Sequence, residues 1–280
     1  MRKLTRTLAL AFGLLLGSGL AQAFNLDLGK LVDIAKQASN MGEIDEERER
    51  SLGADMAAQL LGAAPLLDNP GLQKYVNDLG QWLALQTDRP GLQWRFGVLD
   101  TNDINAFAAP GGYVFVTAGL IGRLQSEAEL AAVVAHEIGH VVRKHHLVAI
   151  QDQAGSNIMT NLMSIAADQD ENSAEWNMLI DAGSDLYTKG LSRDDELDAD
   201  LVGVVILARA GYDPYALASV LQRLGGVNPS DSTLALMTKT HPAPDERLLV
   251  LLAAMGDQLD SYATQPQLEA RFRKQVAGEG

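Results

Sequence analysis

The chain has 280 residues, of which 47% are hydrophobic and 21% charged, and its formal net charge at neutral pH is −14. This composition is typical of globular proteins and excludes the disordered, collagen-like and coiled-coil classes. We do not expect so acidic a chain, which has no basic stripe, to bind nucleic acid through its phosphates. The sequence contains no cysteine and only five histidines, so a metal site has to be built from His, Asp and Glu.

Residues 1–23 have the pattern of a secretory signal peptide. Three cations within the first six residues precede an apolar run, and residues 21–23 read Ala-Gln-Ala, the small-x-small form of a cleavage site. We expect cleavage before Phe24 and export, to the periplasm first and the extracellular medium second. The alternative is an N-terminal membrane anchor, which the short, glycine-rich run disfavours. No later stretch is apolar over 18 residues, so we expect no transmembrane segment after signal removal.

The first half of the exported chain is predicted to be two helices and a small sheet. Residues 25–61 repeat apolar positions at helical spacing around a charged stretch, which we interpret as a solvated face. A turn at 69–71 precedes an amphipathic helix over 72–85. Residues 92–99 and 113–116 read as strands with a strong turn at 110–112, which predicts a small antiparallel unit over 92–118. We therefore expect 24–70 to be a helical segment that packs on a domain formed by 71–280.

The second half is predicted to be helical. Ser126 to Glu129 fit a capping box that opens an apolar helix reaching about residue 148. Helices over roughly 150–166 and 173–188 form a polar, Met-rich insertion. Ser192 is expected to cap a further helix that ends at Gly211, a residue suited to a left-handed terminus. No fixed-period repeat is present. The predicted fold class is α+β, mainly helical, with a small antiparallel sheet.

The segment His136-Glu137-Ile138-Gly139-His140 carries the clearest chemical signal. On a helix the two histidines share one face, so their imidazoles can occupy adjacent corners of a tetrahedral zinc site. Glu137 is turned by about 100° from His136, so it can reach a zinc-bound water without ligating the metal. Such a water is acidified, and a carboxylate can take its proton and deliver it to a leaving amine. The alternative is a pair of surface histidines on a helix.

The next capped helix supplies candidates for the remaining ligands. Glu196 and Asp200 are four residues apart and share a face. We interpret Glu196 as the third metal ligand and Asp200 as the acceptor for the outer N–H of a ligating histidine. The alternative is that acidic residues simply favour a helix start. His145 and His146 are expected to be solvent-facing residues near the end of the first ligand helix.

These motifs resemble those of the gluzincin-clan zinc metallopeptidases in the HtpX and CAAX-prenyl-protease family. The resemblance runs over roughly residues 100–250 and rests on the segments His136-Glu137-Ile138-Gly139-His140, Ser192-Arg193-x-x-Glu196-x-x-x-Asp200, Gly211-Tyr212-Asp213-Pro214 and Thr240-His241-Pro242. It implies a zincin-type peptidase domain with one zinc ion per chain. The soluble periplasmic branch, which includes outer-membrane-assembly peptidases, often carries a C-terminal helical-repeat domain. No such repeat is found here, so that branch's substrate and partner roles do not transfer automatically.

The resemblance also gives a role to the segment Asn105-Ala106-Phe107. In related peptidases an edge strand above the zinc pairs with an extended substrate as an additional strand. Asn105 would then hold a substrate backbone group beside the scissile bond. The alternative is an ordinary hairpin strand.

His241 has three possible roles. Pro242 and Pro244 hold its segment in a stiff path that we expect to be non-helical, and similar periplasmic relatives place such a histidine over the zinc. It either ligates zinc at rest and shuts out water, or donates a hydrogen bond to the tetrahedral oxyanion. In the third alternative it is a loop histidine tied to a carboxylate, and Arg247 is a structural ion-pair partner.

The sequence thus predicts a zinc-dependent metalloendopeptidase that cleaves polypeptides in the periplasm. Its expected role is envelope or outer-membrane protein quality control, with unfolded or misassembled outer-membrane proteins among the expected substrates. One alternative is a chaperone-like or adaptor protein with a seldom-used metal site, against which the intact Glu137 argues. The other is a zinc hydrolase with a small-molecule substrate, against which the strand-like segment near Asn105 argues.

Overall fold

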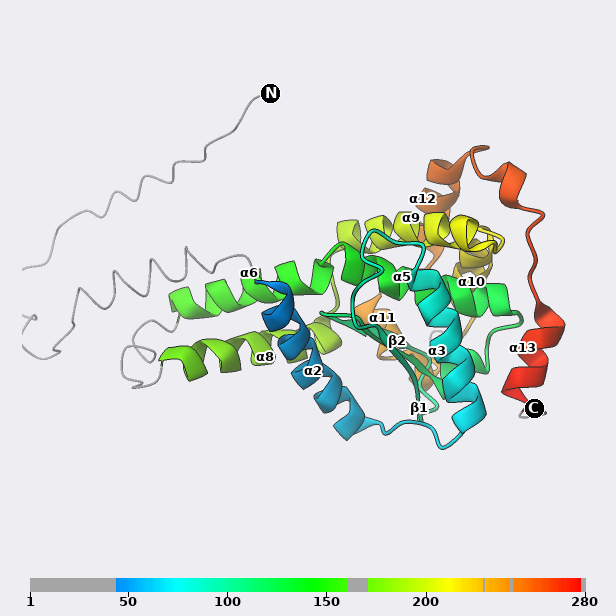
Figure 1. The fold of residues 1–280 in the computed structure, drawn as a ribbon. Coiled ribbons are helices and arrows are strands. Elements are labelled where there is room, and N and C mark those ends of the chain that lie inside the picture. The colour runs from blue at the N-terminus through cyan, green and yellow to red at the C-terminus, as the bar shows by residue number, and fades with distance from the viewer. Residues whose placement is uncertain (1–43, 161–170, 229, 242–243, 278–280) are drawn as a thin grey trace, which may run out of the picture.

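The computed structural model describes residues 44–160, 171–228, 230–241 and 244–277. In these residues helices surround a small sheet (Figure 1). The predicted signal peptide and residues 24–43 of the predicted N-terminal helical segment lie outside the described residues. Within the described ranges no helix is both long and apolar enough to cross a bilayer.

The sheet has three strands, β1 (Arg95–Leu99), β2 (Ala106–Ala109) and β3 (Tyr113–Thr117), in the order β1-β3-β2. The predicted α+β class is confirmed, but the sheet is mixed rather than purely antiparallel. β2 and β3 form an antiparallel hairpin, whereas β3 pairs in parallel with β1. After β1 the chain crosses to the far edge before it forms β2, so β3 returns in the direction of β1 and lies between them. Gly111 and Gly112 have φ of 74° and 101°, values that glycine adopts without strain.

Two helices precede and cover the sheet. α2 (Glu46–Ala63) starts at Asp45, which caps it, and packs against β2, β3 and the later helix α8. α3 (Pro70–Ala84) is capped by Asn69 and packs against β1. The predicted helix over 72–85 is therefore confirmed with a slightly earlier start.

α5 (Glu127–Val142) is almost wholly buried and follows the short α4 (Ala118–Ile121). Ser126 caps it as predicted, but the Glu129 carboxylate accepts from the backbone of Gln125 at 2.6 Å instead of closing the capping box. The prediction that this helix reaches residue 148 is wrong. Lys144 has φ of 60°, a left-handed conformation that ends one helix and lets α6 (His145–Thr160) start in a new direction.

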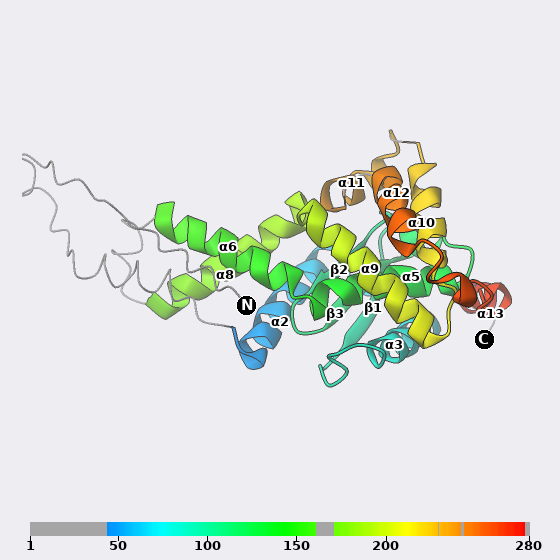
Figure 2. The ribbon, with the colours of Figure 1, turned by 90° about the horizontal axis from the view of Figure 1, so that it is seen from above.

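α6 and α8 (Glu171–Lys189) pack together and project from the rest of the molecule (Figures 1 and 2). They correspond to the two helices of the predicted insertion, whose connecting residues 161–170 are outside the described ranges. α9 (Arg193–Ala210) begins with a complete capping box at Ser192 and ends at Gly211 with φ of 85°. Both predicted ends of α9 are confirmed.

The C-terminal part contains α10 (Ala216–Gly225), α11 (Met237–Thr240), α12 (Pro244–Met255) and α13 (Glu269–Val276), with 3-10 turns at Ser232–Leu234 and Asp260–Tyr262. Pro244 does not continue a non-helical path, because it is the first residue of α12, a position for which the fixed φ of proline is suited. The main hydrophobic core lies between α3, the sheet, α5, α9 and α10. α5 and α9, the two predicted ligand helices, lie side by side in it (Figure 2).

Candidate metal centre and substrate cleft

The histidines of α5 direct the same ring atom toward one point. His136 and His140 are 5% and 0% exposed, and their Nε2 atoms are 3.1 Å apart. One helical turn separates the two residues, so the helix itself sets this spacing. Two neutral imidazoles at this distance can share one hydrogen bond, and both nitrogens become free to act as ligands when neither carries a proton at Nε2.

Glu196 of α9 supplies a carboxylate at the same point. Its Oε2 lies 3.6 Å from Nε2 of His136, and its Oε1 lies 3.4 Å from Nε2 of His140. Although burial opposes it, the surrounding imidazoles, first that of His241, hold the pKa of Glu196 well below its usual range. The charged carboxylate is therefore available as a ligand.

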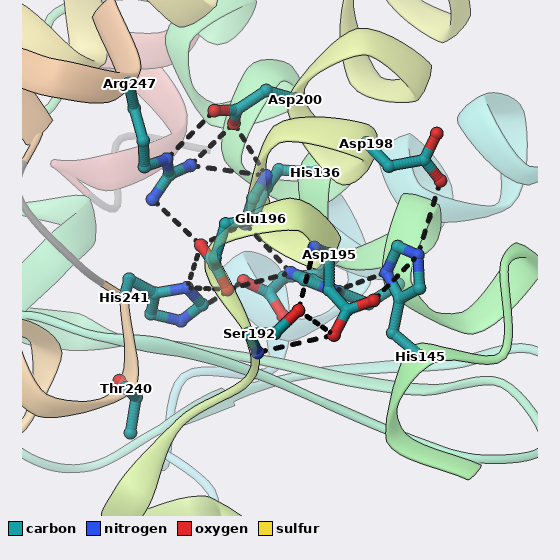
Figure 3. Close-up of polar contacts among 12 residues, drawn as sticks. His136, His145, Ser192, Asp195, Glu196, Asp198, Asp200, Thr240, His241 and Arg247 are labelled. Carbon is teal, nitrogen blue, oxygen red and sulfur yellow. Dashed lines mark hydrogen bonds and ion pairs between the residues drawn. The ribbon is translucent and has the colours of Figure 1, made fainter. Parts of the chain in front are cut away.

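His241 completes a set of four donors. It is the residue after α11, and its Nδ1 lies 3.0 Å from Oε2 of Glu196 (Figure 3). One ligand atom from each of His136, His140, Glu196 and His241 lies within 4.8 Å of the others. Tetrahedral ligands at zinc's usual 2.0–2.1 Å distance stand about 3.4 Å apart. The three imidazoles and one carboxylate therefore fit a zinc ion in chemistry and in spacing.

Asp200 lies one turn after Glu196, and its carboxylate contacts the ring nitrogen of His136 that faces away from the ligand cluster. Its Oδ1 is 2.9 Å from Nδ1 of His136. The guanidinium of Arg247 bonds the same carboxylate at 2.6 and 2.9 Å and Glu196 at 3.1 Å. Burial alone would raise the pKa of Asp200, but Arg247 lowers it to about 2. Arg247 thus joins α12 to both acidic residues of α9, the ion-pair role that the third alternative for His241 predicts.

The prediction that His145 faces solvent is wrong. It is 9% exposed, and its Nδ1 lies 3.0 Å from Nδ1 of His140. Its Nε2 lies 3.3 Å from Oδ2 of Asp198 on α9 (Figure 3). The turn at Lys144 brings the first residue of α6 back over α5, so both histidines of α5 are held through their outer nitrogens.

Glu137 points into the cleft beside these ligands without belonging to the donor set. It is 2% exposed, and its Oε1 is 3.9 Å from Nε2 of His241. Burial raises the pKa of the Glu137 carboxyl, which favours proton exchange nearer neutral pH. The position fits a group that handles a proton next to a metal.

Two of the three residues predicted to bind substrate, Ala106 and Phe107, line a cavity beside Glu137, and Asn105 does not. β2 is an edge strand of the described sheet, and this cavity measures about 20 Å³. Asn105, directly before β2, is fully buried, and its Oδ1 has no hydrogen-bond partner among the described residues. Its Nδ2 lies 3.5 Å from Oγ1 of Thr240.

Two further polar side chains of this cavity were not identified from the sequence. Tyr187 of α8 and His146 of α6 both line it, and Oη of Tyr187 and Nδ1 of His146 have no partner among the described residues. The expected solvent-facing position of His146 is therefore also wrong. Neither residue has a spacing signal, because both come from helices that fold back over the cleft from outside the motif.

The chain is similar to several curated proteins. The chain is 32% identical over 235 residues to the "Beta-barrel assembly-enhancing protease" of Escherichia coli (strain K12), which covers 81% of this chain and 47% of the relative. It is 30% identical to "Mitochondrial metalloendopeptidase OMA1" of Arabidopsis thaliana, over 68% of this chain and 37% of the relative. It is 25% identical to "Metalloprotease LoiP" of Escherichia coli (strain K12), over 80% of this chain and 86% of the relative.

The chain thus spans about half the length of the first of these relatives. The model of peptidase family M48 matches residues 70–254, which include the predicted ligands and the edge strand. The predicted metallopeptidase family is confirmed by these matches. The chain belongs to peptidase family M48.

Proposed function

We propose that this protein is a zinc-dependent endopeptidase that cleaves polypeptides in the periplasm. The observation that carries the proposal is the convergence of the His136, His140 and Glu196 ligand atoms beside a buried Glu137 and an edge strand. The family match supports a metallopeptidase. The donor set favours zinc, for which nitrogen and carboxylate ligands in tetrahedral arrangement are usual.

In this proposal His136, His140 and Glu196 hold the ion. Asp200 and His145 are positioning residues that orient the two imidazoles through their outer nitrogens. A bound zinc ion supplies Lewis acidity toward a carbonyl oxygen and toward water.

Glu137 performs the proton transfers. Its buried carboxylate accepts a proton from the attacking water and passes it to the amine that leaves when the peptide bond breaks. Glutamine in this position keeps the shape of the side chain but cannot accept that proton. A carboxylate at position 137 is therefore needed for a peptidase, whereas an adaptor that only retains the metal has no need of it.

β2 orients the substrate. An extended polypeptide added along this edge receives backbone hydrogen bonds from the strand. Asn105, whose Oδ1 has no partner among the described residues, provides a fixed polar group at the start of the strand. A small molecule would gain nothing from such an edge, which favours a polypeptide substrate over the small-molecule alternative.

The signal-like N-terminus and the name of the first relative support a role in the cell envelope. A relative named for enhancing beta-barrel assembly is consistent with unfolded or misassembled outer-membrane proteins as substrates. We infer export through a cleaved signal peptide, so N-terminal sequencing of the protein from a periplasmic extract should begin at Phe24. A protein that retains Met1 would contradict this inference.

The central test compares purified wild-type protein with Glu137→Gln. Both should contain about one zinc ion per chain, whereas cleavage of unfolded casein should fall by at least a hundredfold in the variant, as expected for loss of general base catalysis, about 10²–10⁴-fold. Zinc is measured by elemental analysis and cleavage by release of labelled peptides. Equal cleavage by the two proteins, or a wild type that binds zinc but cleaves no polypeptide, would contradict the proposal, and the second result would favour the adaptor alternative.

A further inference from the structure

A cavity of about 360 Å³ lies between α3 and α13, two helices that contact each other (Figure 1). Its volume falls in the range of about 300–1,000 Å³ that is usual for small-molecule sites. We call this space the aromatic pocket. Its lining includes Tyr75, Asp78 and Trp82 of α3, Glu127 at the start of α5, and Arg271 and Gln275 of α13.

The aromatic pocket is separate from the metal centre. Glu127 lies nine residues before His136 on α5, which is about 14 Å along a helix that rises by about 1.5 Å per residue. None of the described residues that line the aromatic pocket lines the cavity beside Glu137. A ligand in the aromatic pocket therefore leaves the proposed metal ligands untouched.

Trp82 offers an aromatic face whose position is already restrained. The residue is 48% exposed, and its indole N–H donates to the carbonyl oxygen of Ala210 at 3.0 Å. A ring that is held in this way loses little conformational freedom when a flat ligand stacks on it. The free protein thus presents a preformed surface for stacking.

The polar groups of the lining offer hydrogen bonds to a hydroxyl-rich ligand. The Tyr75 hydroxyl donates to Glu127 at 2.8 Å, so its oxygen keeps the capacity to accept a hydrogen bond. The Gln275 amide can donate and accept, and the Asp78 carboxylate can accept. A ligand that covered these groups without bonding them would remove them from water at a cost in free energy. A wholly apolar ligand therefore fits the pocket poorly.

The charges of the pocket favour a neutral ligand. Arg271 bonds the Glu127 carboxylate, and Lys74, one turn earlier on α3, pairs with Asp78. Each carboxylate of the pocket thus has a cation, and neither sign is in excess. A charged ligand would lose its water without gaining an unpaired partner, which is unfavourable.

We propose that the aromatic pocket binds a neutral oligosaccharide, one ring of which stacks on Trp82. The C–H face of a pyranose ring is apolar and packs on an aromatic ring, while the hydroxyls around it donate and accept hydrogen bonds. An engineered cavity that accepts benzene measures about 150 Å³, so 360 Å³ has room for about one or two six-membered rings. The site is independent of the proposed endopeptidase function.

The first test measures saccharide binding to the purified full-length wild-type protein by calorimetry. The neutral probes are maltotriose, cellotriose and triacetylchitotriose, and at least one should bind with a Kd of about 1 mM or lower. The cationic glucosamine trimer and an anionic hyaluronan tetrasaccharide should bind at least tenfold more weakly than the best neutral probe. No binding of any neutral probe at about 10 mM, or tighter binding of a charged one, would overturn the inference.

N-acetyl-tryptophanamide tests the alternative that the pocket receives an aromatic side chain of a polypeptide. It should bind more weakly than the best saccharide, because it bonds fewer of the polar groups around Trp82. If it bound and no saccharide did, the inference would be wrong and the pocket would be a polypeptide site.

Variants of Trp82 link saccharide binding to the aromatic pocket. Trp82→Ala should weaken binding about tenfold, the scale of one aromatic contact, whereas Trp82→Phe keeps a ring and should stay within about threefold of wild type. Leu85→Ala is the matched control, because Leu85 follows α3, is 60% exposed and does not line the pocket. Thermal melts establish that each variant is folded. Equal binding by wild type and Trp82→Ala, or an equal loss in Leu85→Ala, would overturn the assignment.

Casein cleavage separates this inference from the proposed function. Trp82→Ala should cleave casein at the wild-type rate, and Glu137→Gln should bind the saccharide as tightly as wild type, because the two sites share no lining residue among those described. Cleavage without saccharide binding would overturn this inference and leave the endopeptidase intact. Saccharide binding without cleavage would support this inference and contradict the proposed function.

Discussion

His241 shows how one side chain can decide whether a metal centre is open. Its Nδ1 lies 3.0 Å from the Glu196 carboxylate, as the carboxylate-tied alternative expects, and one of its ring nitrogens belongs to the four-donor set, as the resting-ligand alternative expects. A fourth protein ligand would fill the position that a catalytic zinc site keeps for water and substrate. Removing it should therefore expose that position without removing the other three ligands.

We accordingly expect His241→Ala to retain zinc and to cleave casein several-fold faster than wild type, with increased autolysis. Initial rates at equal zinc occupancy are the measurement. A fall of about 10²–10³-fold in turnover would instead identify His241 as an oxyanion donor. Unchanged cleavage rates and unchanged zinc binding in His241→Ala would show that His241 has no role in the site.

His145 gives a second expectation at the scale of one residue. It holds the outer nitrogen of His140 and is itself held by Asp198, and loss of such partners weakens metal binding by about 10–100-fold. We expect this loss in His145→Ala, measured by competition with a zinc-chelating dye. Arg143→Ala is the control, because Arg143 bonds the same Asp198 carboxylate from an exposed position. Equal zinc affinity of His145→Ala and wild type would show that His140 needs no such support.

The residues that the sequence could place are those related by local geometry. His136 and His140, or Glu196 and Asp200, are one helical turn apart, so the helix alone brings each pair to one face. His145 was misplaced because its contact depends on the left-handed turn at Lys144, where no glycine marks a helix end. Tyr187 and His146 reach the cleft only through the packing of α6 and α8.

At the scale of elements, the centre depends on how closely α5 and α9 approach. A Cβ atom at Gly139 would lie 3.0 Å from the backbone oxygen of Ala199, and one at Gly203 would lie 3.3 Å from the backbone nitrogen of His136. Each glycine thus faces the backbone of the opposite helix. Because neither glycine has a side chain, α5 and α9 approach closely enough for His136 and His140 to lie beside Glu196.

Gly139→Ala should separate the two helices slightly. We expect a destabilisation of about 1–3 kcal/mol, typical of overpacking, and weaker zinc binding, measured by urea unfolding and dye competition. Gly62→Ala is the control at an exposed glycine of α2, where nothing lies within 4 Å of the added carbon. It should stabilise the protein by about 0.4–1 kcal/mol. If both substitutions changed the free energy of unfolding in the same direction, the close approach of the helices would not explain the glycine at position 139.

The sheet shows which part of the arrangement of elements the sequence could not provide. Alternation and the turn at 110–112 identified the strands and the β2–β3 hairpin, because a hairpin is a local structure. The parallel pairing of β1 with β3 joins strands that are not consecutive. Nothing in the alternation of either strand specifies its neighbour, so the antiparallel expectation was wrong for this pair.

At the scale of the whole molecule, the C-terminal helix α13 contacts the start of α5, the helix that carries the two histidines. Phe272 of α13 is 3% exposed and belongs to the main core. Arg271 bonds the buried carboxylate of Glu127, the first residue of α5. Tyr75 of α3 and the hydroxyl of Tyr212 donate to the same carboxylate at 2.8 and 2.6 Å. One carboxylate therefore joins three parts of the chain that are far apart in sequence.

This carboxylate should make stability depend on pH. Burial alone would raise the pKa of Glu127, but the bonds from Arg271, Tyr212 and Tyr75 lower it below its usual value. A glutamate in the unfolded chain titrates near pH 4.3, so below about that pH the unfolded state binds more protons than the folded state. The stabilisation from Glu127 is therefore present above about pH 4.3 and is lost as the pH falls through the lower folded-state value.

Glu127→Gln should consequently lower the free energy of unfolding by about 1.5–3 kcal/mol at neutral pH, the cost of losing hydrogen bonds to a charged group. The difference from wild type should shrink as the pH falls from about 4.3 toward 2. Urea midpoints across this range measure it. Glu269→Gln serves as the control, because its pair with Arg273 lies on the exposed face of α13 and such pairs contribute about 0.3–0.5 kcal/mol. If the stability of wild type and of Glu127→Gln changed with pH in the same way, the charge of Glu127 would not contribute to the packing of α13.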